Sequence, residues 1–170
     1  MTPLQPPDLH HFNAAVGWLQ LGNHLEANEE LEQIEPRFRV HPDVLVLRWE
    51  VYAKLMRWDM AVEVAVALIE LVPDDAFGYI HRSFALRRLN GIQAAWDKLL
   101  PVADKFKDNW IVPYNLACYA CQLGNLEAAR EWYKQAMAID EKAVQRTAID
   151  DPDLKPLWDS MGGSIWKRAE

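Results

Sequence analysis

An alanine recurs every 34 residues along most of this chain, at Ala27, Ala61, Ala95 and Ala129. A leucine stands six residues before each alanine, at Leu21, Leu55, Leu89 and Leu123. Because four small residues at one interval, each with the same companion, are hard to obtain by chance, they indicate a repeated structural unit. A single unit of this length cannot bury its own apolar face, so the pattern predicts units that stack against one another.

Each repeat carries the signals of two helices. Gly22, Gly91 and Gly124 are suited to end a helix, because glycine adopts the left-handed backbone conformation at low cost. Asn23 can then cap the helix that follows. Pro101 lies inside one expected helix and should kink it. The pattern predicts helices over residues 8–20, 24–35, 43–55, 59–71, 76–88, 92–105, 110–122 and 126–141.

The fourth repeat has the most regular pattern of residue types: a leucine, a small residue, a glycine, an alanine, an aromatic residue and an alanine. They stand at Leu116, Ala117, Gly124, Ala129, Tyr133 and Ala136. In this pattern the 34-residue unit resembles the tetratricopeptide repeat (TPR), over residues 8–143. The second unit departs from it, with Arg48 and Trp49 where a leucine and a small residue belong.

The resemblance implies an all-α fold, a right-handed superhelical solenoid of four helix–turn–helix units with a short C-terminal capping helix. The expected organisation is an N-terminal extension, residues 1–7, then units 8–41, 42–75, 76–109 and 110–143, then a capping segment, residues 144–170. That last segment breaks the period and should form a short helix ending at Gly162 and Gly163. Leu154, Leu157 and Trp158 are predicted to cover the open apolar edge of the fourth unit; the alternative is a flexible tail that binds another molecule.

The resemblance also implies a concave groove lined by the first helix of each unit. Steps of three and four residues keep these positions on one helix face. The predicted groove residues are Phe12, Val16, Leu19, Val46, Glu50, Lys54, Phe77, Ile80, Phe84, Arg87, Arg88, Tyr114 and Cys118. Most are apolar, and an exposed apolar surface usually marks a binding site. Alternatively the groove is buried, because the superhelix closes on itself, the C-terminal tail folds back, or two chains pair.

We therefore predict a non-enzymatic scaffold that binds a peptide or helix of a partner protein in this groove. Lys54, Arg87 and Arg88 would attract acidic residues of an otherwise apolar partner segment. Two alternatives stay open: a chaperone-like holder of a client protein, and a self-assembling homo-oligomeric module. A carboxylate clamp is not expected, because the lysines and asparagines that such TPR domains use are missing from the corresponding positions.

No catalytic residue, metal site or cofactor is predicted. Hydroxyl nucleophiles are scarce, with Thr2, Ser83, Thr147, Ser160 and Ser164 as the only serines and threonines. Cys118 and Cys121 have the spacing of a redox or metal motif, but they lie within a predicted helix and no second ligand pair follows. We expect them to be two small residues on a helix surface.

The composition and the apolar stretches of the sequence limit which partners and which cellular compartment are expected. The chain has 18 Lys and Arg against 25 Asp and Glu, a net charge of −7, which disfavours nucleic acid and anionic membranes as partners. The start of the sequence lacks a basic region followed by an apolar stretch, so no secretory signal is expected. The most apolar stretch, residues 62–72, is too short to span a membrane and contains two glutamates. These features predict a cytoplasmic protein.

Overall fold

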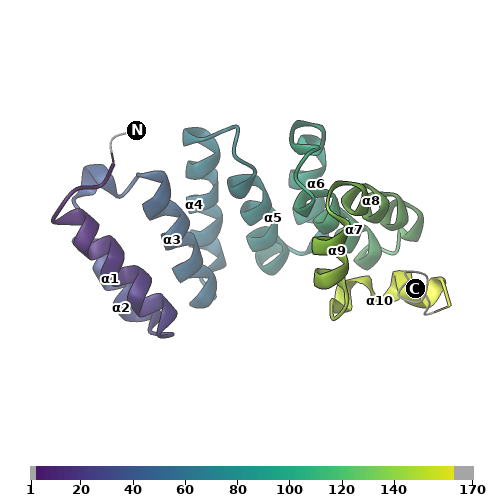
Figure 1. Cartoon of the computed structure of the whole chain (residues 1–170), viewed down its shortest axis with the longest axis horizontal. Helices are drawn as coiled ribbons and strands as arrows, with labels where there is room; N and C mark the ends of the chain where they lie inside the picture. Colours follow the sequence, from purple (N-terminus) through teal and green to yellow (C-terminus); the bar gives the residue numbers. More distant parts are fainter. Residues whose placement is uncertain (1–2, 163–170) are drawn as a thin grey trace. The chain divides into compact units, whose positions relative to one another are not determined.

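The computed structural model describes residues 3–162 and is helical, with no strand among those residues (Figure 1), so the predicted all-α class is confirmed. The α-helices are α1 (Asp8–Gln20), α2 (His24–Gln33), α3 (Pro42–Lys54), α4 (Trp58–Leu71), α5 (Ala76–Asn90), α6 (Ile92–Leu99), α7 (Ile111–Gln122), α8 (Leu126–Ile139), α9 (Glu141–Ala148) and α10 (Lys155–Ser160). None of the described helices is both long and apolar enough to cross a bilayer.

The chain divides into two compact units, unit 1 up to Ala85 and unit 2 from Leu86 onward. The boundary falls within α5, and each unit is described separately below. Two parts of the predicted organisation, residues 1–2 of the N-terminal extension and residues 163–170 of the capping segment with Gly163, lie outside the described residues.

Glycines end the first helix of three repeats, as predicted. Gly22, Gly91 and Gly124 follow α1, α5 and α7 with φ angles of 79°, 91° and 80°. The second repeat has Met56 at this position, with a φ of 56°, although a side chain disfavours that conformation. The backbone of a repeat therefore keeps its turn even where the sequence lacks the residue that best suits it.

The four periodic alanines are fully buried, each with 0% of its surface exposed. Three of the predicted helix pairs are in extensive contact: α1 with α2, α3 with α4, and α7 with α8. Small residues at these positions let the paired helices approach closely, as expected from the repeat. The companion leucines differ, since Leu21, Leu89 and Leu123 are exposed at the ends of their helices.

The arginine that departs from the repeat pattern, Arg48, is buried at the carboxyl end of α2. It donates to the backbone carbonyl of Leu31 at 3.2 Å and forms an ion pair with Glu32. Arg39 donates to a carbonyl of the same helix end, that of Ile34, at 2.7 Å. Carbonyls at a helix end lack partners within the helix, so the two guanidinium groups cap α2.

The helix predicted over residues 92–105 is shorter than expected. Helix α6 ends at Leu99 and gives way to two 3-10 turns, Leu100–Val102 and Asp104–Phe106. Pro101 lies in the first of these turns, where it lacks an N–H and its ring crowds the preceding helical turn. The predicted kink is therefore an end of the α-helix rather than a bend in it.

The segment after the fourth repeat packs onto unit 2. Helix α9 packs on α8, the 3-10 turn Pro152–Leu154 packs on α7, and α10 contacts both α7 and α8. Leu154 and Leu157 are fully buried there, at 0% exposure, and the ring of Trp158 lies edge-on to Tyr133 at 5.0 Å between centroids. These apolar side chains cover the α7–α8 pair, the position where a cap was expected.

Candidate functional site

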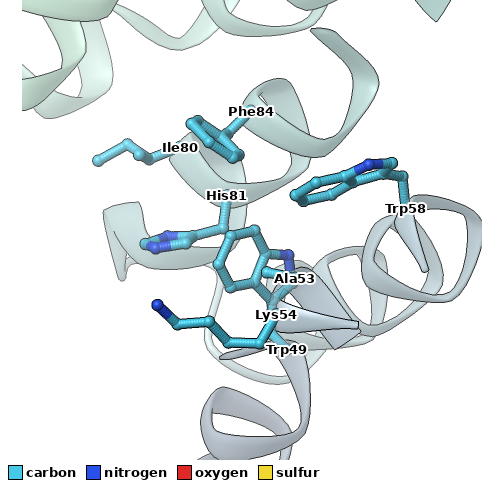
Figure 2. A pocket seen from close by; sticks show the side chains of 7 residues that line it. All are labelled: Trp49, Ala53, Lys54, Trp58, Ile80, His81 and Phe84. Carbon is cyan, nitrogen blue, oxygen red and sulfur yellow. The ribbon is translucent and has the colours of Figure 1, made fainter. Parts of the chain in front are cut away.

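An open pocket of about 400 Å³ lies in unit 1 between helices α3, α4 and α5 (Figure 2). Its lining is mostly apolar and aromatic, and consists of Trp49, Ala53 and Lys54 from α3, Trp58 from α4, and Ile80, His81 and Phe84 from α5. Phe84 follows His81 by three positions and Ile80 by four, so its side chain is next to both of theirs on the helix surface. The volume lies within the range of about 300–1,000 Å³ that is typical of ligand pockets.

Aromatic rings form the walls of this pocket. The ring of Phe84 meets Trp49 and Trp58 edge to face, with centroids 6.2 and 6.0 Å apart. His81 lies edge-on to Trp49 at 4.3 Å and stacks on Phe77 at 3.6 Å. Edge-to-face and stacked rings stabilise one another, which fixes the shape of the walls.

His81 is held in one orientation and in its neutral form. Its Nδ1 lies 2.9 Å from the carbonyl oxygen of Phe77, which can only accept, so Nδ1 carries the hydrogen and donates it. Burial lowers the pKa of His81, and this outweighs the carbonyl and the charge of Asp75, which raise it. His81 therefore adds no charge to the pocket near neutral pH.

Two polar groups at the pocket have no partner within the described part of the chain. The indole Nε1 of Trp49 is buried and makes no hydrogen bond, although a buried donor is normally paired. Figure 2 shows this nitrogen on the edge of the ring that faces Trp58. Lys54 is exposed and forms no ion pair. The pocket thus offers an N–H donor and one positive charge beside its apolar walls.

The structure places the predicted groove residues of unit 1 in different surroundings. Lys54, Ile80 and Phe84 line the pocket, and Phe77 lies next to it against His81. Four others, Phe12, Val16, Leu19 and Val46, are half-buried against the apolar core. Glu50 is exposed and does not line the pocket. Arg88, at the end of α5 and within unit 2, is also exposed.

The remaining predicted groove residues, Arg87, Tyr114 and Cys118, lie in unit 2 and contact the C-terminal segment. The Tyr114 hydroxyl donates to Asp151 at 2.7 Å, and the Cys118 thiol donates to the same carboxylate oxygen at 3.6 Å. Arg87 binds both oxygens of Asp153, one of them at 2.6 Å. The chain's own acidic segment therefore occupies this face of unit 2.

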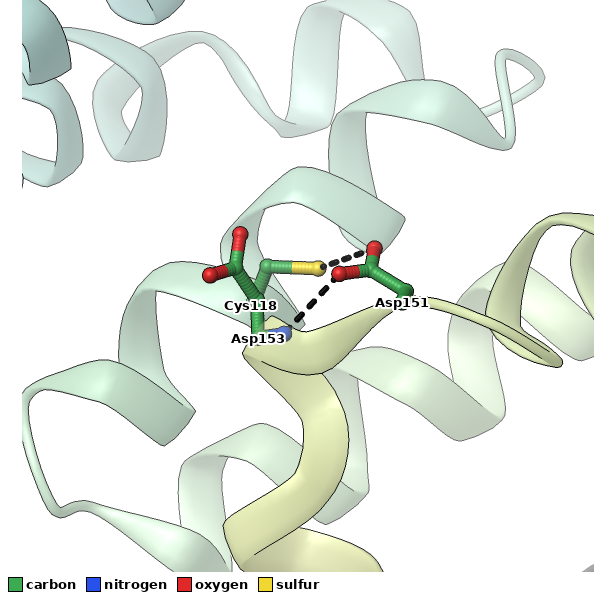
Figure 3. Close-up of side chains that lie close together, drawn as sticks. All are labelled: Cys118, Asp151 and Asp153. Atoms are coloured by element: carbon green, nitrogen blue, oxygen red, sulfur yellow. Dashed lines mark hydrogen bonds between the residues drawn. The ribbon is translucent and has the colours of Figure 1, made fainter.

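Cys118, Asp151 and Asp153 bring three potential metal-ligand atoms within 4.8 Å of one another (Figure 3). A metal ion requires the thiolate, but burial and the two carboxylates raise the pKa of Cys118, and its thiol hydrogen is donated to Asp151. The guanidinium of Arg87 already neutralises Asp153. The three residues fit a hydrogen-bond and ion-pair network better than a metal site.

The two cysteines do not lie on a helix surface, which corrects the expectation from the sequence. Cys118 and Cys121 are 3% and 2% exposed, because the C-terminal segment covers this face of α7. Burial raises the pKa of both thiols. Low-pKa, accessible thiols are the reactive ones, so these two have the surroundings of structural cysteines.

The raised thiol pKa values make stability fall at high pH. Above about pH 8.5 the thiols of the unfolded chain lose their protons while those of the folded chain keep them. Unfolding then releases protons, and we expect the free energy of unfolding to decrease by at most about 1.4 kcal/mol per pH unit for each thiol. Urea denaturation at pH 7, 8, 9 and about 10 measures this slope. The Cys118→Ala variant should have a smaller slope, whereas equal stability at every pH would show that the thiols ionise in the folded chain.

Several of these residues carried weaker signals in the sequence. In the sequence Trp49 stands out only as a departure from the repeat, because its large ring occupies a position where the pattern has a small residue. Trp58 carried no signal, because it is the first residue of α4 and precedes the periodic pattern. Asp151 and Asp153 lie outside the repeats, and only their contacts in the folded chain, to Tyr114 and Gln122 respectively, relate them to α7.

Known structures with the same fold are similar to this chain. The thermophilic TPR protein TTC0263 from Thermus thermophilus is 20% identical, with a TM-score of 0.70 over 91% of this chain and 83% of that one. Residues 41 to the end of MamA from Desulfovibrio magneticus RS-1 are 14% identical, with a TM-score of 0.69 over 79% of this chain and 76% of that one.

No protein-family model matches the sequence, and no curated protein matches it. At these identities the structural likeness establishes the fold alone. The resemblance that the 34-residue repeat predicted is thereby confirmed, and the chain has the helical-repeat fold of the TPR type.

Proposed function

We propose that this protein is a non-enzymatic interaction scaffold that binds a segment of a partner protein in the aromatic pocket between α3, α4 and α5. The observation that carries the proposal is the open pocket of about 400 Å³ with its rigid aromatic walls. Helical-repeat proteins use surfaces of this kind for binding partners.

The energetics favour a few large contacts. Burial of one Phe- or Leu-sized side chain contributes about 1.5–3 kcal/mol, and aromatic residues in pockets often dominate protein interfaces. Trp58 and Phe84 are half-buried and present such surfaces without having to be ordered first, since their rings already pack against each other. Pre-formed walls lower the entropic cost of binding, which otherwise offsets much of the gain.

A peptide selection tests the proposal. Phage that display random decapeptides are selected on the purified chain, and the enriched peptides are synthesised and titrated by fluorescence anisotropy. We expect Phe84→Glu to weaken binding by about thirtyfold or more, because it removes an apolar wall and introduces a carboxylate. Leu25→Glu is the matched control, since Leu25 is 65% exposed on α2 and is not among the described residues that line the pocket.

A second variant separates loss of binding from loss of folding. Phe84 also packs against the core, so its substitution affects stability as well. Ala53→Gln places a longer polar side chain in the pocket and, although Ala53 also packs against this core, the change removes no apolar side chain larger than a methyl group. We expect Ala53→Gln to fold as wild type by circular dichroism and to bind the selected peptides weakly. The proposal fails if both folded variants bind as tightly as wild type.

A further inference from the structure

The pocket in unit 1 also indicates the chemistry of its partner. We infer that the pocket takes an acidic apolar segment: a large aliphatic or aromatic side chain between the rings, with an Asp or Glu carboxylate beside it that pairs with Lys54. This inference rests on the proposed function and adds the class of partner to it. The carboxylate or a backbone carbonyl of the same segment would accept the hydrogen of Trp49 Nε1.

The charge at the pocket selects an anion. Among the described residues that line it, Lys54 alone is formally charged, because His81 is neutral and the others are apolar or aromatic. Aromatic walls alone would also suit a quaternary ammonium or a methylated lysine. The ammonium of Lys54 would repel such a cation, so the same walls favour an apolar side chain next to a carboxylate.

The buried donor supports the same conclusion. Trp49 is 7% exposed and its Nε1 is unpartnered, so a partner that supplies an oxygen would satisfy a group that is now buried without a hydrogen bond. An unpaired buried donor is costly, and pairing it on binding recovers that cost. A purely aliphatic partner could not supply this oxygen through its side chain.

The protein itself provides an example of such a segment. In unit 2 the run Asp151-Pro152-Asp153-Leu154 binds predicted groove residues with its two carboxylates and is anchored by a fully buried leucine. An arginine and a tyrosine on first helices of the repeats hold these carboxylates. The predicted groove residues of this chain can therefore bind acidic groups that lie next to a buried aliphatic side chain.

The acidic side chains of unit 1 do not line the pocket. Residues 1–85 carry more acidic than basic side chains, and several of the acidic ones, including Glu26, Glu29 and Glu32, are on α2. At physiological ionic strength, charges farther apart than about 8 Å are largely screened. The charge of Asp75 does act on His81, but Lys54 is the charged residue that lines the pocket, so it should decide the preference.

The same decapeptide library, selected in about 0.15 M salt, tests this inference. Wild type should enrich peptides in which a large apolar residue has an Asp or Glu within three positions. Lys54→Glu should enrich basic peptides instead, and it should bind the wild-type peptides about five- to tenfold more weakly. Lys142→Glu, an equal change of net charge on α9 in unit 2, should retain the wild-type preference.

Failure of this inference is distinguishable from failure of the proposed function. If Phe84-dependent peptides are selected but are neutral or basic, or if Lys54→Glu and Lys54→Met leave their affinities unchanged, the acidic preference is wrong and the scaffold proposal stands. If no selected peptide depends on Phe84, the pocket is not the binding site and both proposals fail.

Discussion

Leu154→Ala is expected to lower the free energy of unfolding by about 2–5 kcal/mol. Leu154 ends the 3-10 turn that packs on α7, and it is fully buried at 0% exposure. Truncation removes apolar contacts and leaves a cavity that the neighbouring helices cannot close without moving. Urea denaturation followed by circular dichroism measures the change.

Thiol labelling provides a second readout of the same change. The carboxylate next to this turn, Asp151, accepts hydrogen bonds from Tyr114 and Cys118, so a loosened segment exposes the thiol. We expect Cys118 to react with a thiol reagent faster in Leu154→Ala than in wild type. This result would show that Leu154 holds the acidic segment on the α7 face.

Ile149→Ala is the matched control for this prediction. Ile149 lies in the same segment, but 62% of its surface is exposed, so truncation should change the free energy of unfolding by less than about 0.5 kcal/mol. Equal effects of the two substitutions would contradict the docking of the segment. Unchanged labelling of Cys118 in the destabilised Leu154→Ala variant would contradict its role as a cover for α7.

The repeat allowed most of the helices to be predicted from the sequence. Alanines at one interval marked the places where helices touch, and all four are buried. Glycines marked the turns, although the turn at Met56 forms without one. Three of the four leucines that helped to define the register are exposed, with Leu21 at 77%, whereas Leu55 packs against the core. Periodicity therefore located the units without distinguishing core residues from those at helix ends.

The surfaces were harder to predict than the helices. The predicted groove positions, spaced by three and four residues on each first helix, include Ile80 and Phe84, which line the pocket. They also include Phe12 and Val16, which pack against the core. The spacing is the same in both cases, and only the neighbouring helices decide which side chains stay accessible. The occupation of the α7 face by Asp151 depends on a contact across 37 positions, which no local pattern encodes.

The C-terminal segment resolves one of the alternatives that the sequence left open. The groove positions Arg87 and Tyr114 could have been exposed, paired with a second chain, or covered by the tail. In unit 2 the tail covers them, through Asp153 and Asp151 respectively. For this reason the proposed binding site is restricted to the pocket of unit 1, where Lys54 and Trp49 lack such partners among the described residues.

The same substitution at two helical glycines is expected to change stability in opposite directions. A Cβ on Gly78 of α5 would lie 2.9 Å from a side-chain carbon of Ile69 and 3.1 Å from the backbone oxygen of Ala65, so α4 would have to move. Gly78→Ala should therefore lower the free energy of unfolding by about 1–3 kcal/mol. Around Gly17 of α1 a Cβ would meet no atom within 4 Å, so Gly17→Ala should raise it by up to about 1 kcal/mol through helix propensity. Urea denaturation of both variants measures the difference of about 1–4 kcal/mol, and stabilisation by Gly78→Ala would show that α4 and α5 do not approach this closely.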